Sequence, residues 1–385
     1  RGLFYFENFT DNKPPVFLRQ FQYDSKDPSS LSKNIVRSLF MDDTGIIWIG
    51  TNGGGINIFD PKRKQFKNVR NTSDPNSLSY DKIRSIYEDS NSTLWVGTEG
   101  GGLNMLTKDN DNGSYKHFEH FNSLSKIFAI EETKIGEKPI LMIGTEGFPG
   151  LYFLDISNPN KITEANLTKT DLNNGVFSLL SDSNENLWVG TYNTGIHRWI
   201  KTDTVGHFIK QSFGHYPGKT NSVSSNIIRN ILEDHNGNIW LATGDGLCVL
   251  TSKEKYKKRP KFKVFKHDPT NPKSISHNYV LSLYESLSGV IWAGTFGGGL
   301  NKYIPGTDEN PATFEHYSTL NGLPNNVIKG ILEDGNQNLW LSTNKGLSSF
   351  DPEKEIFKNY NSSDGLQNNE FQELACLKRA DGEML

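Results

Sequence analysis

Ile47-Trp48-Ile49-Gly50-Thr51 is an apolar run with a central tryptophan that ends in Gly-Thr, and three glycines follow at 53–55. The same block occurs seven times in the 385-residue chain, with Met142 in place of tryptophan in the third copy. The copies lie at 48–51, 95–98, 142–145, 188–191, 240–243, 292–295 and 340–343, in steps of 47, 47, 46, 52, 52 and 48 residues. A period in this range is typical of repeat architectures in which each unit packs on its neighbours.

Each repeat reads as four short strands. In the first copy, apolar or alternating runs at 34–40, 46–50, 56–59 and 65–69 are separated by Asp, Gly and Pro residues that favour turns. The second copy (83–87, 94–97, 103–106, 115–118) and the fifth (227–232, 239–242, 247–250, 262–265) repeat that order. No stretch has a sustained helical period. The sequence therefore predicts an all-β fold, a β-propeller of four-stranded blades in which the tryptophan packs between blades.

The repeats also suggest domain limits. Residues 1–33 read as the last two strands of a blade followed by a linker, 34–371 as a seven-repeat propeller, and 372–385 as the start of a further blade. Two alternatives stay open for the ring. It has seven blades, or it has eight if the two terminal half-blades pair with each other. The abrupt start at Arg1 suggests a fragment, so the N-terminus carries no information about export.

Composition excludes several classes of function. The net charge is −3 and the pI about 6.3, so the chain has no basic excess for nucleic acid. Two cysteines make no disulfide framework, and no apolar run is long enough to span a membrane. Neither Gly-x-Ser-x-Gly nor His-Glu-x-x-His occurs, and the nine histidines show no metal-ligand spacing. We therefore expect no catalytic residues, no metal and no cofactor.

Candidate ligand-binding residues come from positions where the copies differ. The innermost strand of a blade lines the central channel, and its equivalent positions carry four cations that favour an anionic ligand. A bland alternative is that each cation pairs with an acid of its own or the next blade, such as Glu88, Glu233 or Glu333. Aromatic residues that follow the conserved threonine could stack on a sugar ring. The candidates are Arg37, Arg84, Arg229, Lys329, Tyr192 and Phe296.

The repeats resemble those of the two-component regulator propeller family. The resemblance is carried by 34–40, by 43–57, and by the inter-repeat phrases at 27–32 and 74–79, and it covers nearly all of 27–371. It implies the periplasmic sensor part of an inner-membrane hybrid two-component system of Bacteroidetes type. In such proteins paired propellers and a β-sandwich precede a membrane span and a histidine kinase, and a glycan-derived oligosaccharide switches on transcription of utilisation genes.

Three hypotheses about function follow. The first is a periplasmic sensor module that binds an oligosaccharide and signals to a kinase, with neighbouring propeller and sandwich modules of the same protein and a homodimer of the complete protein as partners. The second is a structural or protein-interaction propeller without a ligand. The third, a polysaccharide lyase or hydrolase, lacks a convincing catalytic set. Fold alone does not decide among them, so the first rests on the resemblance.

Overall fold

The chain forms two compact units, which divide between Phe66 and Lys67. The computed structural model describes residues 2–7, 16–25, 30–43, 45–59, 66, 68–108, 115–158, 161–202, 204 and 207–385. The linker residues 26–29 of the first inter-repeat phrase lie outside these ranges. The division also differs from the predicted limits 1–33, 34–371 and 372–385, because the first repeat falls in the smaller unit. Those limits stay a prediction about how blades are grouped.

Unit 1, residues 1–66, holds a hairpin and a three-stranded sheet. The hairpin pairs β1 (Leu3–Glu7) with β2 (Val16–Phe21), and the sheet has the order β3 (Val36–Met41), β4 (Ile47–Thr51), β5 (Ile56–Phe59). The fourth strand expected at 65–69 is not a strand at its described residues 66, 68 and 69, and residues 60–65 and 67 lie outside the described part.

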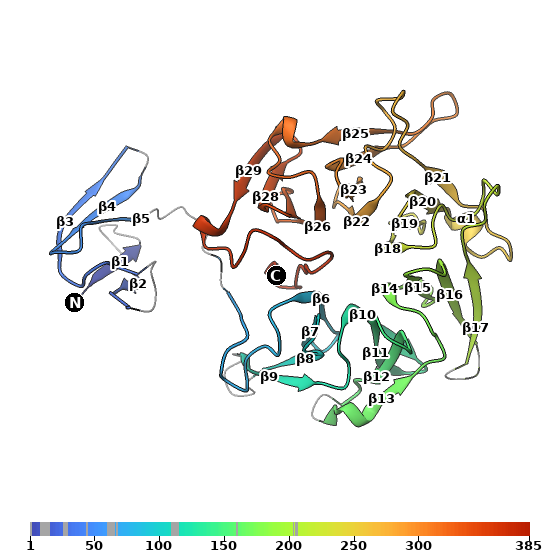
Figure 1. Cartoon of the computed structure of the whole chain (residues 1–385), viewed down its shortest axis with the longest axis horizontal. Coiled ribbons are helices and arrows are strands. Elements are labelled where there is room, and N and C mark those ends of the chain that lie inside the picture. Colours follow the sequence, from blue (N-terminus) through green and yellow to red (C-terminus); the bar gives the residue numbers. More distant parts are fainter. Residues whose placement is uncertain are drawn as a thin grey trace. The chain divides into compact units, whose positions relative to one another are not determined.

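Unit 2, residues 67–385, is a ring of antiparallel sheets (Figure 1). Its described residues form six four-stranded sheets, each with its strands in chain order, which we number blades 1 to 6. The inner strands are β6 (Ile83–Glu88), β10 (Ile127–Ile135), β14 (Val176–Ser181), β18 (Ile228–Glu233), β22 (Val280–Glu285) and β26 (Ile328–Glu333). The second strands are β7 (Leu94–Thr98), β11 (Lys138–Thr145), β15 (Leu187–Thr191), β19 (Ile239–Thr243), β23 (Ile291–Thr295) and β27 (Leu339–Thr343).

The outer half of each blade completes the sheet. The third strands are β8 (Leu103–Lys108), β12 (Leu151–Asp155), β16 (Ile196–Lys201), β20 (Gly246–Leu250), β24 (Leu300–Ile304) and β28 (Gly346–Asp351). The fourth are β9 (Tyr115–Phe121), β13 (Leu167–Lys169), β17 (Phe208–Phe213), β21 (Lys263–Phe265), β25 (Thr313–Tyr317) and β29 (Ile356–Tyr360). One short helix, α1 (Ser252–Lys255), and 3-10 turns at Glu164–Asn166, Thr319–Asn321 and Ser362–Asp364 lie in the described connections. The predicted all-β propeller of four-stranded blades is confirmed.

The C-terminal residues 374–385 take a seventh position in this ring, between blades 6 and 1 (Figure 1). The N–H of Leu374 donates to the carbonyl of Lys329 in β26 at 2.9 Å, and the N–H of Ala380 donates to Glu88 at the end of β6 at 3.2 Å. Lys378 and Met384 form a bridge across the turn between them. A hairpin therefore stands here in the place of an inner and a second strand.

The block tryptophans of blades 1, 3, 4 and 5 pack between blades, as expected. Trp188 of blade 3, for example, packs on Ile228 and Leu241 of blade 4. In four blades the ring is also braced within its own blade, because the indole N–H donates to an aspartate six residues earlier. These pairs are Trp95–Asp89, Trp188–Asp182 and Trp240–Asp234 at 2.8 Å and Trp340–Asp334 at 3.0 Å. Blade 5 has Ser286 at the aspartate position and blade 2 has Met142 at the tryptophan position.

A second repeated contact joins neighbouring blades. A backbone N–H in the turn after the inner strand donates to the glutamate at the sixth position of the inner strand of the next blade; we call this contact the clasp. The pairs are Ser90–Glu132, Ser183–Glu233, His235–Glu285, Leu287–Glu333 and Ala380–Glu88, at 2.6 to 3.2 Å. The last pair joins the C-terminal hairpin to blade 1. The hairpin therefore closes the ring with the same contact that joins complete blades.

Candidate functional site

The predicted channel residues share one backbone feature. Each inner strand has a register shift after its first residue, so that its second residue is the extra one of a β-bulge. A bulge bends the strand and re-aims the extra side chain. These second residues are Arg37, Arg84, Phe128, Phe177, Arg229, Leu281 and Lys329. The repeat register therefore places one variable side chain per blade at the same end of the channel.

Four of these side chains form a continuous row across blades 1 to 4. The guanidinium carbon of Arg84 lies 4.5 Å from the ring centre of Phe128, and that of Arg229 lies 4.4 Å from the ring centre of Phe177. The two phenyl rings meet edge to face, with centres 5.0 Å apart. Cations over aromatic faces are attracted by the ring quadrupole. The row thus holds two guanidinium groups over phenyl rings beside the channel.

Burial affects both arginines. It lowers the pKa of Arg84, although the carboxylates of Glu99 and Glu146 partly raise that pKa again. It also lowers the pKa of Arg229. Both stay charged at neutral pH, because the guanidinium pKa is above 12 to begin with. The Nε atom of each is buried without a hydrogen-bond partner among the described residues. Each guanidinium therefore keeps one donor that its present neighbours leave unused.

The chain itself lies on this row. Residues 370–374, which we call the strap, lead into the closing hairpin. Arg84 Nη1 donates to Gln372 Oε1 at 3.0 Å, and Arg229 forms an ion pair with Glu373. Lys329 Nζ donates to Glu370 Oε1 at 3.3 Å and to the Phe371 carbonyl at 2.6 Å. Between the row and the strap a cavity of only about 10 Å³ remains, about the size that one water needs.

The structure brings together three of the four predicted cations. Arg84, Arg229 and Lys329 line the ring of unit 2 and contact the strap, whereas Arg37 occupies the equivalent bulge position in unit 1. Of the partners proposed for the cations, Glu88, Glu233 and Glu333 are clasp acids at the far ends of their strands. Arg84 does approach an acid of its own blade, Glu99, at 3.9 Å.

Aromatic side chains surround the same end of the channel. Tyr192 is 53% exposed and meets Phe177 edge to face at 5.4 Å, so it extends the row outward. Phe296 is 52% exposed and packs on Tyr279 at 5.9 Å. Sequence reasoning passed over Tyr80, which is exposed in the linker before β6 and lies 3.5 Å from the Cβ position of Gly100. The sequence feature that could have identified Tyr80 is a bulky residue directly after the repeated Leu-Ser pair of the inter-repeat phrase.

The opposite end of the inner strands has a different chemistry. A pocket of about 400 Å³ lies there, lined by Tyr87, Glu88, Asp89, Ser90, Glu132, Thr133, Lys134, Ser181 and Glu185. Of its acids, Glu88 and Glu132 serve the clasp, Asp89 serves the tryptophan brace, and Glu185 pairs with Lys201. Among the described residues, no group of three or more His, Cys, Asp or Glu side chains is arranged to hold a metal ion. We find no described helix that is long and apolar enough to cross a membrane.

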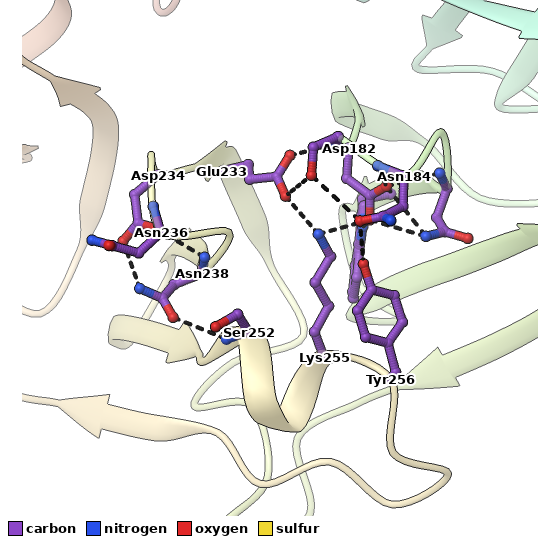
Figure 2. A network of polar contacts seen from close by, with 12 residues as sticks. Asp182, Asn184, Glu233, Asp234, Asn236, Asn238, Ser252, Lys255 and Tyr256 are labelled. Carbon is purple, nitrogen blue, oxygen red and sulfur yellow. Dashed lines mark hydrogen bonds and ion pairs between the residues drawn. The ribbon is translucent and has the colours of Figure 1, made fainter.

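A buried lysine joins blades 3 and 4 at that end (Figure 2). Lys255 of α1 is 1% exposed, and its Nζ lies 3.0 Å from Asp182 Oδ2 and 2.6 Å from Glu233 Oε1. Burial works against the charged form of Lys255, but the hydrogen bonds to Glu233 and Asp182 outweigh it and raise the pKa of the lysine. Tyr256 donates to Asn184 beside it at 2.5 Å. We interpret this network as a structural joint, because the single ammonium group of Lys255 is shared by a carboxylate from each blade.

Comparison with known proteins agrees with the repeat pattern. The family model for the two-component regulator propeller matches residues 30–53, 77–100, 170–193, 222–245 and 322–345. The extracellular domain of a hybrid two-component system from B. thetaiotaomicron is similar to 96% of this chain, at 26% identity and a TM-score of 0.69. A curated protein of Formosa agariphila, Histidine kinase P4, is 27% identical over 206 residues, or 54% of this chain.

The chain spans only part of these relatives, 46% of the extracellular domain and 14% of the histidine kinase. A virginiamycin B lyase from Staphylococcus aureus shares the fold alone, at 14% identity and a TM-score of 0.51, over 76% of this chain and 87% of its own.

Proposed function

We propose that this chain, which carries two-component regulator propeller repeats, is the ligand-sensing part of an extracytoplasmic sensor in a hybrid two-component system. Its similarity to the extracellular domain of such a system and to a histidine kinase supports this proposal. The sensor would lie in the periplasm as part of an inner-membrane protein. It would signal through further modules of that protein, as a homodimer, to a kinase that controls transcription.

The proposed ligand is a glycan-derived oligosaccharide, bound at the channel end that carries the row. One observation carries this choice. Two arginines are held over phenyl rings next to an exposed tyrosine, and no described residue accepts a hydrogen bond from the Nε of either. Arg groups bind carboxylates or sulfates through two parallel hydrogen bonds, and the face of Tyr192 offers an apolar surface to a sugar ring. Phe296 would contact the ligand farther round the same rim.

Signalling would follow from a difference in affinity. A ligand shifts an equilibrium between two states only by as much as it prefers one of them. The bound sugar would have to prefer one arrangement of the propeller with its neighbouring modules. A ligand-free structural propeller is the second candidate, because the strap already pairs the three cations. A lyase or hydrolase activity is not supported by any set of groups around the row.

A thermal-shift screen tests the proposal. The chain is mixed with neutral, uronic and sulfated oligosaccharides, each in large excess. A sugar at about 100 times its dissociation constant adds about 2.7 kcal/mol to the free energy of unfolding. We expect one class to raise the melting temperature, Tyr192→Ala to abolish the shift, and Tyr256→Ala to preserve it. Tyr256 is a matched control because it is 54% exposed but lies at the other end of the ring. The absence of any shift would refute sugar sensing by this chain.

A further inference from the structure

The strap resembles a ligand in the way it meets the row. Within five residues it presents two carboxylates and one amide oxygen, and these meet the three channel cations of unit 2. Glu373 pairs with Arg229, whose guanidinium carbon lies over the ring of Phe177. The Glu373 carboxylate thus lies beside an arginine and an aromatic ring. The carboxylate of a uronic acid residue in a sugar chain would need the same surroundings.

The strap is also an incomplete ligand. Arg84 receives only the neutral oxygen of Gln372 and a distant contact from Glu99 at 3.9 Å. Its Nε and the Nε of Arg229 are buried, and neither donates to a residue that the structure describes. A buried donor without a partner costs free energy, because it has given up its hydrogen bonds to water. A carboxylate that engaged Nε and one Nη together would remove that cost, so a free ligand can bind these arginines better than the strap does.

Release of the strap would reach the ring closure. The strap continues into the hairpin that is tied to blade 6 by Leu374 and to blade 1 by Arg379 and Ala380, which meet Glu88. All three ties lie within ten residues of Glu373 along the chain. Displacing the strap therefore acts directly on the segment that closes the ring.

We propose that the strap is an internal competitor for the sensor site, and that the ligand it excludes carries carboxylates, as an oligouronide does. This inference rests on the proposed function and names its ligand class and its control. Binding of the oligouronide displaces residues 370–374 from Arg84 and Arg229 and loosens the closing hairpin. The free chain is held in the strapped state, so weak anions do not trigger it.

The expected magnitude follows from the population of the open state. The apparent dissociation constant equals the intrinsic one divided by the fraction of molecules that are open. If the strap is closed in about nine molecules of ten, its release tightens ligand binding about tenfold. Glu373→Gln removes the charge of the strap at Arg229 and leaves both arginines in place. Glu309→Gln, an exposed glutamate in the loop between β24 and β25, is the control for net charge.

The experiment measures binding of tetragalacturonate by calorimetry and amide exchange by mass spectrometry. We expect E373Q to bind tetragalacturonate about tenfold more tightly than the parent chain, and E309Q to bind it as the parent does. In the parent, the sugar should speed amide exchange at 370–374 while that of β10 and β22 stays unchanged. Fully methyl-esterified tetragalacturonate, which has the same rings without charge, should do neither. If E373Q does not fold, the amide-exchange measurement on the parent chain tests the competitor proposal by itself.

The failures are distinguishable. Equal affinity of E373Q and the parent for tetragalacturonate, or slower exchange of the strap on binding, overturns the competitor and leaves sugar sensing standing. The same holds if only a neutral or sulfated sugar from the screen binds, with the strap unchanged. If no sugar binds the parent or E373Q, both the inference and the proposed function fall.

Discussion

Lys255→Met tests the buried joint between blades 3 and 4. Methionine keeps the length and apolar stem of lysine but removes the charge that lies between Asp182 and Glu233. Asp182 is fully buried, so without the lysine it becomes an uncompensated interior charge. Removing one partner of a buried ion pair costs about 3 to 5 kcal/mol. Asp182 keeps its bonds from Trp188 and Asn186, and Glu233 keeps those from Ser183, so we expect a loss of about 3 kcal/mol.

Urea unfolding followed by tryptophan fluorescence measures this loss as a lower midpoint at an unchanged slope. Lys253→Met removes an exposed lysine from the same helical turn and should stay within about 0.5 kcal/mol of the parent. A double-mutant cycle with Glu233→Gln should give a coupling energy of about 1 to 3 kcal/mol. A loss below about 1 kcal/mol for K255M would show that the joint is as weak as a surface ion pair, which would refute the reasoning.

Three further predictions concern the brace and the ring closure. Ser286→Asp should stabilise unit 2 by about 1 kcal/mol, because it supplies the acceptor that braces the tryptophan in four other blades; an unchanged urea midpoint would contradict this, and Ser288→Asp is the control. The hydrogen bond from Arg379 holds the pKa of Glu88 below its usual range, so this glutamate stabilises the ring at neutral pH, and its contribution is lost as the pH falls through the lowered pKa. Glu88→Gln should therefore lower the free energy of unfolding, measured with urea, by about 1.5 to 3 kcal/mol at about pH 7 and by much less at about pH 3; an equal loss at both would exclude the charge as the cause. Burial raises the pKa of the Cys376 thiol to about 11, so thiol reagents should label this cysteine slowly. E88Q should speed the labelling of Cys376 about tenfold, while Cys248 in β20 stays unreactive. Unchanged labelling of Cys376 would mean that the hairpin does not depend on the clasp.

The parts of the fold that repeat could be predicted from the sequence. The tryptophan block and the turn residues give the strands of blades 1 and 4 to within a few residues, since seven copies confirm one another. The position that the structure shows to be the bulge residue could also be picked out, because Arg84, Arg229 and Lys329 stand at equal distances from their blocks. The tryptophan brace could not be predicted in this way. The aspartate six residues before the tryptophan indicates only a turn when the sequence is considered alone.

The parts that occur once could not be predicted. Nothing local marks 370–374 as a strap, because Glu370 and Glu373 lie in a linker whose counterparts contain mainly Ser and Asn. Their partners are 41 and 144 residues away along the chain. Likewise, periodicity cannot tell which compact unit a repeat joins. Trp48 has the same sequence context as Trp95, yet it is 38% exposed in unit 1 while Trp95 is fully buried.

The bulge at the start of each inner strand has a consequence for how such rings diversify. Residues in a regular strand alternate between two packed faces, so a change at one of them disturbs a neighbouring blade. The extra residue of a bulge stands outside that alternation. Arg84, Phe128, Phe177, Arg229, Leu281 and Lys329 show what this permits, since six blades of one framework carry four different residue types there. The side chains that line the channel can therefore change during evolution in one blade at a time, while the sheets that carry them stay the same.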